Sequence, residues 1–170
     1  MFTKILVAIA NFTDSEVIFE PVLELAKLSH ARLMLLHVLS SQDKHYPTLN
    51  RYPLKAYPQQ WHNFQTHSIK QLRSLAQRAT AAHVQTEVAQ TFGDPGYGIC
   101  ALAQTWYADL IVVGSRDRAD VRGSFLESVS NYVKHNAHCS VLIVHPPIDT
   151  KESQNRDSSE LPTSNRTTNP

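Results

Sequence analysis

Two apolar runs separated by a polar loop and an amphipathic stretch constrain the fold of this chain most strongly. The first run covers residues 109–114 and leads into the loop, the amphipathic stretch covers Ser124 to His135, and the second run covers Ser140 to Val144. Two buried strands joined through a helix form a parallel crossover unit. Because open α/β sheets bind ligands outside the carboxyl ends of their strands, the loop from Gly114 to Ser130 is the first candidate for a binding site.

The same alternation of strand and helix extends through the preceding sequence. Hydrophobic patterning predicts strands at Thr3 to Ala10, Arg32 to Leu39 and Val84 to Thr91. It predicts helices at Asp14 to His30, Pro58 to His83 and Asp94 to Tyr107. A polar loop, Ser40 to Tyr57, precedes the long helix. This alternation predicts an α/β fold with a parallel sheet covered on both faces.

The helical stretches carry their own packing and capping signals. The inward positions predicted for the first two helices are Val17, Ile18, Val22, Leu25 and Ala26, then Ile69, Leu72, Leu75, Ala76 and Ala79. Pro21 lacks an N–H and clashes one turn back, so we expect a kink or a late start in the first helix. Asp94 and Pro95 form an N-cap and first-turn pair for the third helix.

Composition sets the class of protein and its surroundings. The net charge of +1 gives no general attraction to nucleic acid or to anionic membranes, and the longest apolar runs have the length of strands. Met1 leads almost directly into a strand without the pattern of a secretory signal. Cys100 and Cys139 fit buried thiols, with a disulfide or reactive pair as the alternative. We therefore expect a cytoplasmic protein.

The chain divides into one domain and a tail. Residues 1–147 hold the patterned elements, whereas residues 148–170 consist mostly of Ser, Thr, Asn, Pro and charged residues. Such a segment buries too little apolar surface to offset the entropy lost on ordering. We predict an α/β domain over 1–147 and a disordered polar tail over 148–170.

Several segments together resemble the universal stress protein family. The resemblance is carried by Gly114 to Arg116, Ser128 to Val133 and Cys139 to Val144, and is supported by Lys4 to Ile9, Met34 to Val38 and Gly93 to Gly96. It covers residues 2–146 in the family's order. The resemblance implies a single doubly wound, Rossmann-like sheet of five parallel strands in the order 3-2-1-4-5. It also places Ser140 to Val144 at a sheet edge, where we expect a homodimer contact.

The family's nucleotide-binding members place Gly, two residues, Gly, nine residues, Gly and then Ser or Thr around the phosphates. Aligned with this pattern, Gly114 and Ser128 match, whereas Asp117 and Glu127 replace the other two glycines. The family's acidic residue at the end of the first strand falls on Ala10. Each carboxylate facing a phosphate costs roughly 1 to 4 kcal/mol, depending on the effective dielectric. The resemblance therefore implies a degenerate adenine-nucleotide site.

Two features of the loop leave alternatives open. Arg116, Arg118 and Arg122 either grip a phosphate or pair with nearby carboxylates at the surface. Ser124 and Glu127 fit a capping box, in which their own side chains accept hydrogen bonds from the backbone N–H groups at the helix start. In the alternative, which the resemblance implies, the helix begins at Ser128. The predicted nucleotide-binding residues are Gly114, Arg116, Ser128, Val129, Ser130 and Val38.

No catalytic or metal-binding constellation stands out in the sequence. Ser128 lacks an obvious general base, and His135 and His138 lack further converging ligands. His135 fits a helix end, where a cation is favourable. We predict a non-enzymatic stress-response homodimer that requires no cofactor, binds ATP or AMP weakly and binds neither nucleic acid nor membrane. The alternatives are an ATP- or AMP-binding sensor, in which the three loop arginines compensate for the lost glycines, and a slow nucleotide hydrolase.

Overall fold

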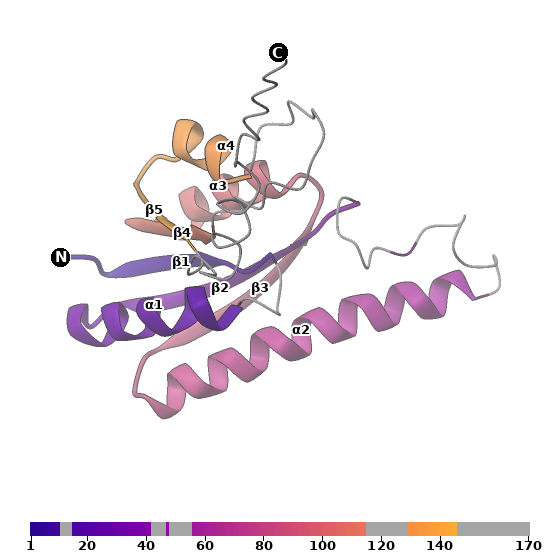
Figure 1. Ribbon diagram of the computed structural model, residues 1–170, viewed down its shortest axis with the longest axis horizontal. Helices are drawn as coiled ribbons and strands as arrows, with labels where there is room; N and C mark the ends of the chain where they lie inside the picture. Colours follow the sequence, from indigo (N-terminus) through magenta and orange to yellow (C-terminus); the bar gives the residue numbers. More distant parts are fainter. Residues whose placement is uncertain (11–14, 42–46, 48–55, 115–128, 146–170) are drawn as a thin grey trace, which may run out of the picture.

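A single parallel sheet of five strands organises the fold (Figure 1). The computed structural model describes residues 1–10, 15–41, 47, 56–114 and 129–145. The strand order is β3-β2-β1-β4-β5, which confirms the predicted order. The strands are β1 Lys4–Ala8, β2 Arg32–Leu39, β3 Thr86–Phe92, β4 Leu110–Gly114 and β5 Ser140–Val144. Each neighbouring pair is parallel, so all the strands end at the same edge of the sheet.

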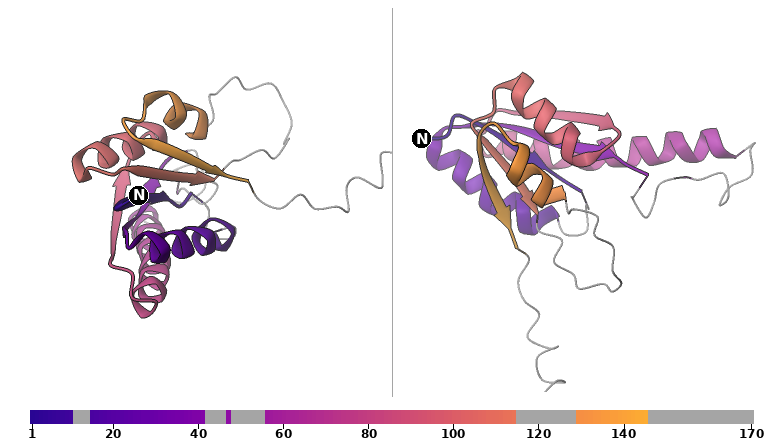
Figure 2. Two further views of the ribbon diagram at one scale, coloured as in Figure 1. Left: turned by 90° about the vertical axis from the view of Figure 1, so that its left-hand side faces the viewer. Right: turned by 90° about the horizontal axis from the view of Figure 1, so that it is seen from above.

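Helices cover both faces of this sheet, as Figure 2 shows. The helices are α1 Ser15–Ser29, α2 Tyr57–Ala81, α3 Pro95–Trp106 and α4 Val129–Asn136. Helices α1 and α2 lie on one face, and α3 and α4 lie on the other. The first half of α2 extends beyond the strands (Figure 1). Near its start, the Trp61 ring stacks on Phe92, the last residue of β3, with 5.7 Å between the ring centroids.

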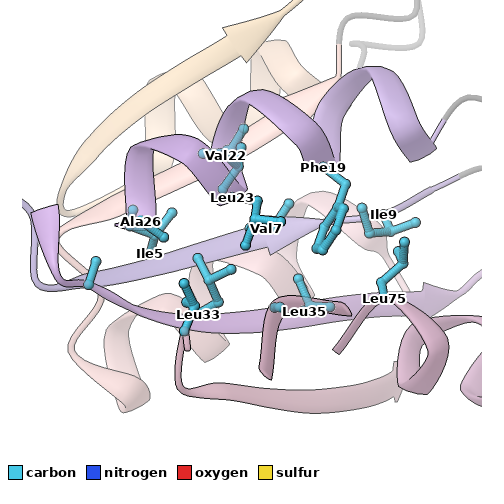
Figure 3. Packing of buried hydrophobic residues seen from close by; sticks show 14 of the residues in the cluster. Ile5, Val7, Ile9, Phe19, Val22, Leu23, Ala26, Leu33, Leu35 and Leu75 are labelled. Atoms are coloured by element: carbon cyan, nitrogen blue, oxygen red, sulfur yellow. The ribbon is translucent and has the colours of Figure 1, made fainter. Parts of the chain in front are cut away.

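The core on the α1 and α2 face is built from large aliphatic residues (Figure 3). Ile5 and Val7 of β1 and Leu33 and Leu35 of β2 point toward α1, whose Phe19 is fully buried. At about 25 cal/mol for each Å² of apolar surface removed from water, each such side chain contributes roughly 1.5–3 kcal/mol. This layer fixes α1 against the sheet.

The core on the α3 and α4 face combines small and large side chains. Its buried residues include Ala8, Cys100 and Ala103, together with Leu6, Met34, Leu36, Ile99, Ile111, Val113 and Val133. Because small side chains let a helix approach the strands closely, α3 can lie near the sheet. This close approach matters for the candidate site described below.

Arg78 of α2 ties α1 to α2 at the protein surface. Its guanidinium donates to the Glu16 carboxylate at 2.6 Å and also to Glu20, and it lies 5.1 Å from the centroid of the Phe19 ring. The hydrogen bond to Glu16 raises the pKa of Arg78 above its ordinary value. These contacts hold the helix that carries Ile18 in place.

Three helices end in Schellman turns with a non-glycine residue in the left-handed conformation. His30, His83 and Tyr107 have φ values of 53°, 62° and 57°. In each turn the next residue donates its N–H to a carbonyl five residues back, as Val84 does to Ala79 at 3.0 Å. The predicted helix ends at His30, His83 and Tyr107 were each one or two residues too late, because these residues are the turns themselves.

At the amino edge of the sheet, a carboxylate binds the start of β1. Asp109 accepts hydrogen bonds from the Thr3 N–H at 2.7 Å, the Thr3 hydroxyl at 2.7 Å and the Lys4 N–H at 3.1 Å. The Lys4 ammonium donates to the Trp106 carbonyl at 3.0 Å. Burial raises the pKa of the Asp109 carboxyl, but the hydrogen bonds from Thr3 and Lys4 outweigh it and hold the pKa below its usual value.

Most of the predicted strands and helices are confirmed, with corrections to the inward face of α1 and to the bounds of β1 and β3. The predicted inward face of α1 missed Phe19 and Leu23, which are buried, whereas Val17, Ile18 and Leu25 are only half-buried. Of the kink or late start expected from Pro21, the late start is wrong, because α1 begins at Ser15 and runs through Pro21, which is exposed to solvent; the kink stays a prediction. Strand β1 is shorter than predicted, Lys4–Ala8 rather than Thr3 to Ala10, and β3 is Thr86–Phe92 rather than Val84 to Thr91.

The predicted inward face of α2 is confirmed, since Leu72, Leu75 and Ala79 are buried and Ile69 and Ala76 pack against them. The predicted Asp94 cap is confirmed by the hydrogen bond that its carboxylate accepts from the Tyr97 N–H at 2.8 Å. The predicted capping box of Ser124 and Glu127 lies outside the described residues, as does the tail over 148–170. Among the described helices, none has the length and apolar character needed to cross a bilayer.

Candidate functional site

The topology places a candidate site at the carboxyl edge of the sheet, between β1 and β4. Helix α1 follows β1 on one face, whereas α4 follows β4 on the other. At such a switch point the two connections diverge and leave a crevice outside the strand ends. The ends of β2 and β4 are separated only by β1, hence by two strand spacings, or about 10 Å.

The structure brings four of the six predicted site residues to this edge. Val38 lies at the end of β2, Gly114 ends β4, and Val129 and Ser130 form the start of α4. Val38 and Val129 are half-buried and pack against the same core cluster. Arg116 and Ser128 lie outside the described residues. The part of the site that the structure describes therefore combines a helix start with an apolar strand end.

Ala10 stands where the resemblance expects a carboxylate. It is the second residue beyond the end of β1, and it is exposed to solvent. A methyl group neither coordinates a metal ion nor accepts a hydrogen bond from a sugar hydroxyl. Within the described residues, no group of three or more His, Cys, Asp or Glu side chains converges in the manner of a metal site.

Gly114, the first glycine of the aligned pattern, has a packing role inside the protein. A Cβ atom added at Gly114 would lie 2.7 Å from the Cδ1 atom of Ile18 in α1. That separation is shorter than carbon atoms tolerate, so a side chain here would push aside the flexible end of Ile18. Gly114 therefore packs closely against α1, whether or not a phosphate binds nearby.

His37 supports the site from the opposite face of the sheet, and the sequence analysis did not single it out. Its ring is 2 % exposed, and its Nδ1 atom lies 2.6 Å from the carbonyl oxygen of Ile9. Since a carbonyl only accepts hydrogen bonds, Nδ1 carries the proton and donates. This bond holds the end of β1, next to Ala10. The available signal was one polar residue inside the otherwise apolar strand β2.

The cysteines are poorly suited to nucleophilic chemistry. Cys100 is buried and Cys139 half-buried, and both are free thiols. Burial raises the pKa of each thiol; for Cys139 the charges of Asp109 and Cys100 raise it further. Because the thiolate is the reactive form, a raised pKa disfavours attack at neutral pH.

A hollow lies at the opposite, amino edge of the sheet. Its volume is about 670 Å³, and its lining includes Lys27, His30, Arg32 and His83. The charges of Lys27 and Arg32 are compensated by Glu24 and Glu87, at 2.7 and 2.6 Å. The carboxyl ends of α1 and α2 also lie here, and their negative potential opposes an anion. We therefore place the candidate site at the carboxyl edge instead.

Comparison with known proteins identifies the relatives of this chain. Residues 1–145 match the model of the universal stress protein family. One universal stress protein of Synechocystis is 37% identical over 106 residues, covering 62% of this chain and 98% of the relative. A second from the same organism is 31% identical over 150 residues, covering 84% of this chain and 97% of the relative.

Solved structures share the same fold. A universal stress protein in complex with cAMP has 24% identity and a TM-score of 0.60, covering 86% of this chain and 98% of that chain. A family member from Arabidopsis thaliana with AMP bound has 22% identity and a TM-score of 0.61, covering 86% and 94%. A third, from Archaeoglobus fulgidus in complex with dAMP, has 19% identity and a TM-score of 0.57, covering 84% and 97%.

Proposed function

Because this chain belongs to the universal stress protein family, we propose that it is a non-enzymatic stress-response protein with a degenerate adenine-nucleotide site. Its ligand would be an adenine nucleotide, AMP or ATP, bound weakly. Family members of the same fold have been solved with cAMP, AMP and dAMP. The residues of this chain at the candidate site support weak binding of such a nucleotide.

The observation that carries this proposal is Ala10, which stands just beyond the end of β1, where the resemblance expects a carboxylate. Gly114, the one glycine of the three that this chain retains, packs against the flexible end of the Ile18 side chain, whose Cδ1 atom would lie 2.7 Å from an added Cβ. This packing gives Gly114 a place in the fold with or without a phosphate. Ala10 removes the acidic group at the end of β1, and the sequence supplies Asp117 and Glu127 where glycines would receive an anion.

The alternative function is a nucleotide sensor with useful affinity. In that case Arg116, Arg118 and Arg122 would neutralise the two carboxylates and contact the phosphates themselves. The nucleotide complexes of the structural neighbours favour this alternative. These arginines lie outside the described residues, so a titration decides between the two functions.

We also propose a homodimer formed through β5. This strand is last in the sheet, and within the described residues it pairs with β4 alone. Leu142 is 41% exposed, and Val141, Ile143 and Val144 are half-buried. An apolar edge strand of this kind is normally paired or covered. The two free thiols fit a reducing compartment, which supports a cytoplasmic location.

Native mass spectrometry of protein purified without added ligand tests both proposals together. We expect a dimer with no co-purified nucleotide, and a monomer for Leu142→Lys. Leu28→Lys is a matched control, since Leu28 is 75% exposed on α1, away from β5, and this variant should stay dimeric. A wild-type monomer at micromolar concentration would contradict the dimer, and stoichiometric nucleotide would favour the sensor. Phosphate release above a protein-free control would indicate a hydrolase.

A further inference from the structure

Helix α3 contains two glycines in its first turns, where alanine would be more stable. Gly96 is buried and Gly98 half-buried within Pro95–Trp106. A glycine inside a helix costs up to about 1 kcal/mol relative to alanine. Neither residue has a positive φ, so backbone conformation does not require glycine at either position. The reason lies in what each glycine touches.

Gly96 faces α4. A Cβ atom added at Gly96 would lie 2.6 Å from Cδ1, 2.8 Å from Cγ and 3.0 Å from Cβ of Tyr132. The Tyr132 ring therefore rests directly on the backbone of α3. Tyr132 lies three residues after Val129, on the same side of the helix. The ring thus sets where α4 begins relative to α3.

Gly98 faces the end of β2. An added Cβ atom would lie 3.3 Å from Cγ2 of Val38 and 3.5 Å from the hydroxyl oxygen of Thr91. The first of these contacts is tighter than most real ones, so alanine would press on Val38 and shift it by a few tenths of an ångström. Val38 is half-buried, with one side covered by α3. Gly98 therefore sets how closely the Val38 side chain approaches the backbone of α3.

We propose that Gly96 and Gly98 are positioning residues for the two halves of a nucleoside phosphate site, an inference that rests on the proposed function. Gly96 places the first turn of α4, whose N–H groups suit a phosphate. Gly98 places Val38, whose apolar side chain suits the base or the ribose. The first turns of α3 thus determine how far apart the two halves lie.

The test compares Gly96→Ala and Gly98→Ala by NMR titration with AMP and with adenosine, which lacks the phosphate. Gly96→Ala should weaken AMP about tenfold, the effect of one misaligned charge-assisted hydrogen bond, and leave adenosine unchanged. Gly98→Ala should weaken both ligands about threefold. A merely structural role would weaken both ligands equally in both variants, and that result, or no loss at all, would overturn the inference.

Two further measurements keep the inference testable in its own right. In the ligand-free protein, Gly96→Ala should shift the amide resonances of Val129 and Ser130, whereas Gly98→Ala should shift that of Val38. If Gly96→Ala fails to fold, Tyr132→Leu releases the same contact from the other side and should give the same loss for AMP. If wild type does not bind AMP, the proposed function alone is overturned. The positioning of α4 and Val38 by the two glycines is tested separately, by the amide shifts of the ligand-free protein. Unshifted amides overturn the positioning alone.

Discussion

The two edges of the sheet are built in different ways. At the amino edge, Asp109 collects three hydrogen bonds, and the C-terminal turns of α1 and α2 are closed by their own backbone. At the carboxyl edge, small or apolar residues lie at or just beyond the described ends of β1, β2 and β4, namely Ala10, Val38 and Gly114. The polar groups of the amino edge therefore serve the fold, whereas the described strand ends of the carboxyl edge offer an apolar surface beside the start of α4.

His37 is an exception to this contrast, because it is a polar side chain with a structural role that lies close to the carboxyl edge. Its hydrogen bond to the Ile9 carbonyl is buried beneath the candidate site. We expect His37→Ala to lower the free energy of unfolding by about 3 kcal/mol, from the lost volume and the unsatisfied carbonyl. Urea denaturation measures it. A loss below about 0.5 kcal/mol would show that the end of β1 is held by something else.

Asp109 tests the structural role of the amino edge. Replacement by Ala removes the acceptor for Thr3 and Lys4, and we expect a loss of about 2 kcal/mol in the free energy of unfolding. AMP affinity should not change, because Asp109 lies at the opposite edge from the candidate site. An Asp109→Ala variant with normal stability but altered AMP affinity would contradict the assignment of a purely structural role to the amino edge.

The same carboxylate predicts a pH dependence. Because the folded pKa of Asp109 lies below its ordinary value, its stabilisation is present above the unfolded pKa and is lost as the pH falls through the folded pKa. Wild type should therefore lose more stability than Asp109→Asn between neutral and strongly acidic pH. Parallel acid profiles for the two proteins would contradict this assignment.

His83 offers a smaller effect of opposite sign. Its φ of 62° is unfavourable for a residue with a side chain, so His83→Gly should raise the free energy of unfolding by about 0.5–1 kcal/mol. His83→Ala is the matched control and should bring no gain. The denaturation midpoints of the two variants decide this. A gain in both would trace the effect to the imidazole rather than to the left-handed backbone.

The smallest effect is expected from the tail. Removing residues 150–170 should leave the melting temperature almost unchanged, because this segment offers few apolar residues to bury. Calorimetry of the full-length and shortened chains measures it. A drop of many degrees would mean that the tail docks on the domain and covers one of the edges.

The sequence predicted the strands and their order in the chain well, because apolar runs and strand–helix alternation are local signals. Strand β2 was predicted at its observed bounds, Arg32–Leu39, and so was β5. The face of α1 was predicted less well, because Phe19 and Leu23 lie on the same helix as several other apolar residues. Which of them turns inward depends on the sheet and on Arg78, and these contacts are distant in the sequence.

The candidate site could be predicted only in part. The resemblance placed Val38, Gly114, Val129 and Ser130 at one edge, where the structure has them. The contact between Ile18 and Gly114 could not be foreseen, since it joins residues nearly a hundred positions apart through the packing of α1 on β4. The role of His37 was equally hidden, because its partner is a backbone carbonyl, which every residue possesses.

The central claim, that the carboxyl edge retains the fold of a nucleotide site but not its affinity, is tested most directly by calorimetric titration with AMP and ATP. The proteins compared are wild type, Asp117→Gly/Glu127→Gly, and the same double variant with Ala10→Asp. We predict weak binding by wild type and about a hundredfold gain in the double variant, if each carboxylate costs about 1.4 kcal/mol. The triple variant should bind at least as tightly as the double variant. Tight binding by wild type, or no gain in either variant, would contradict the account.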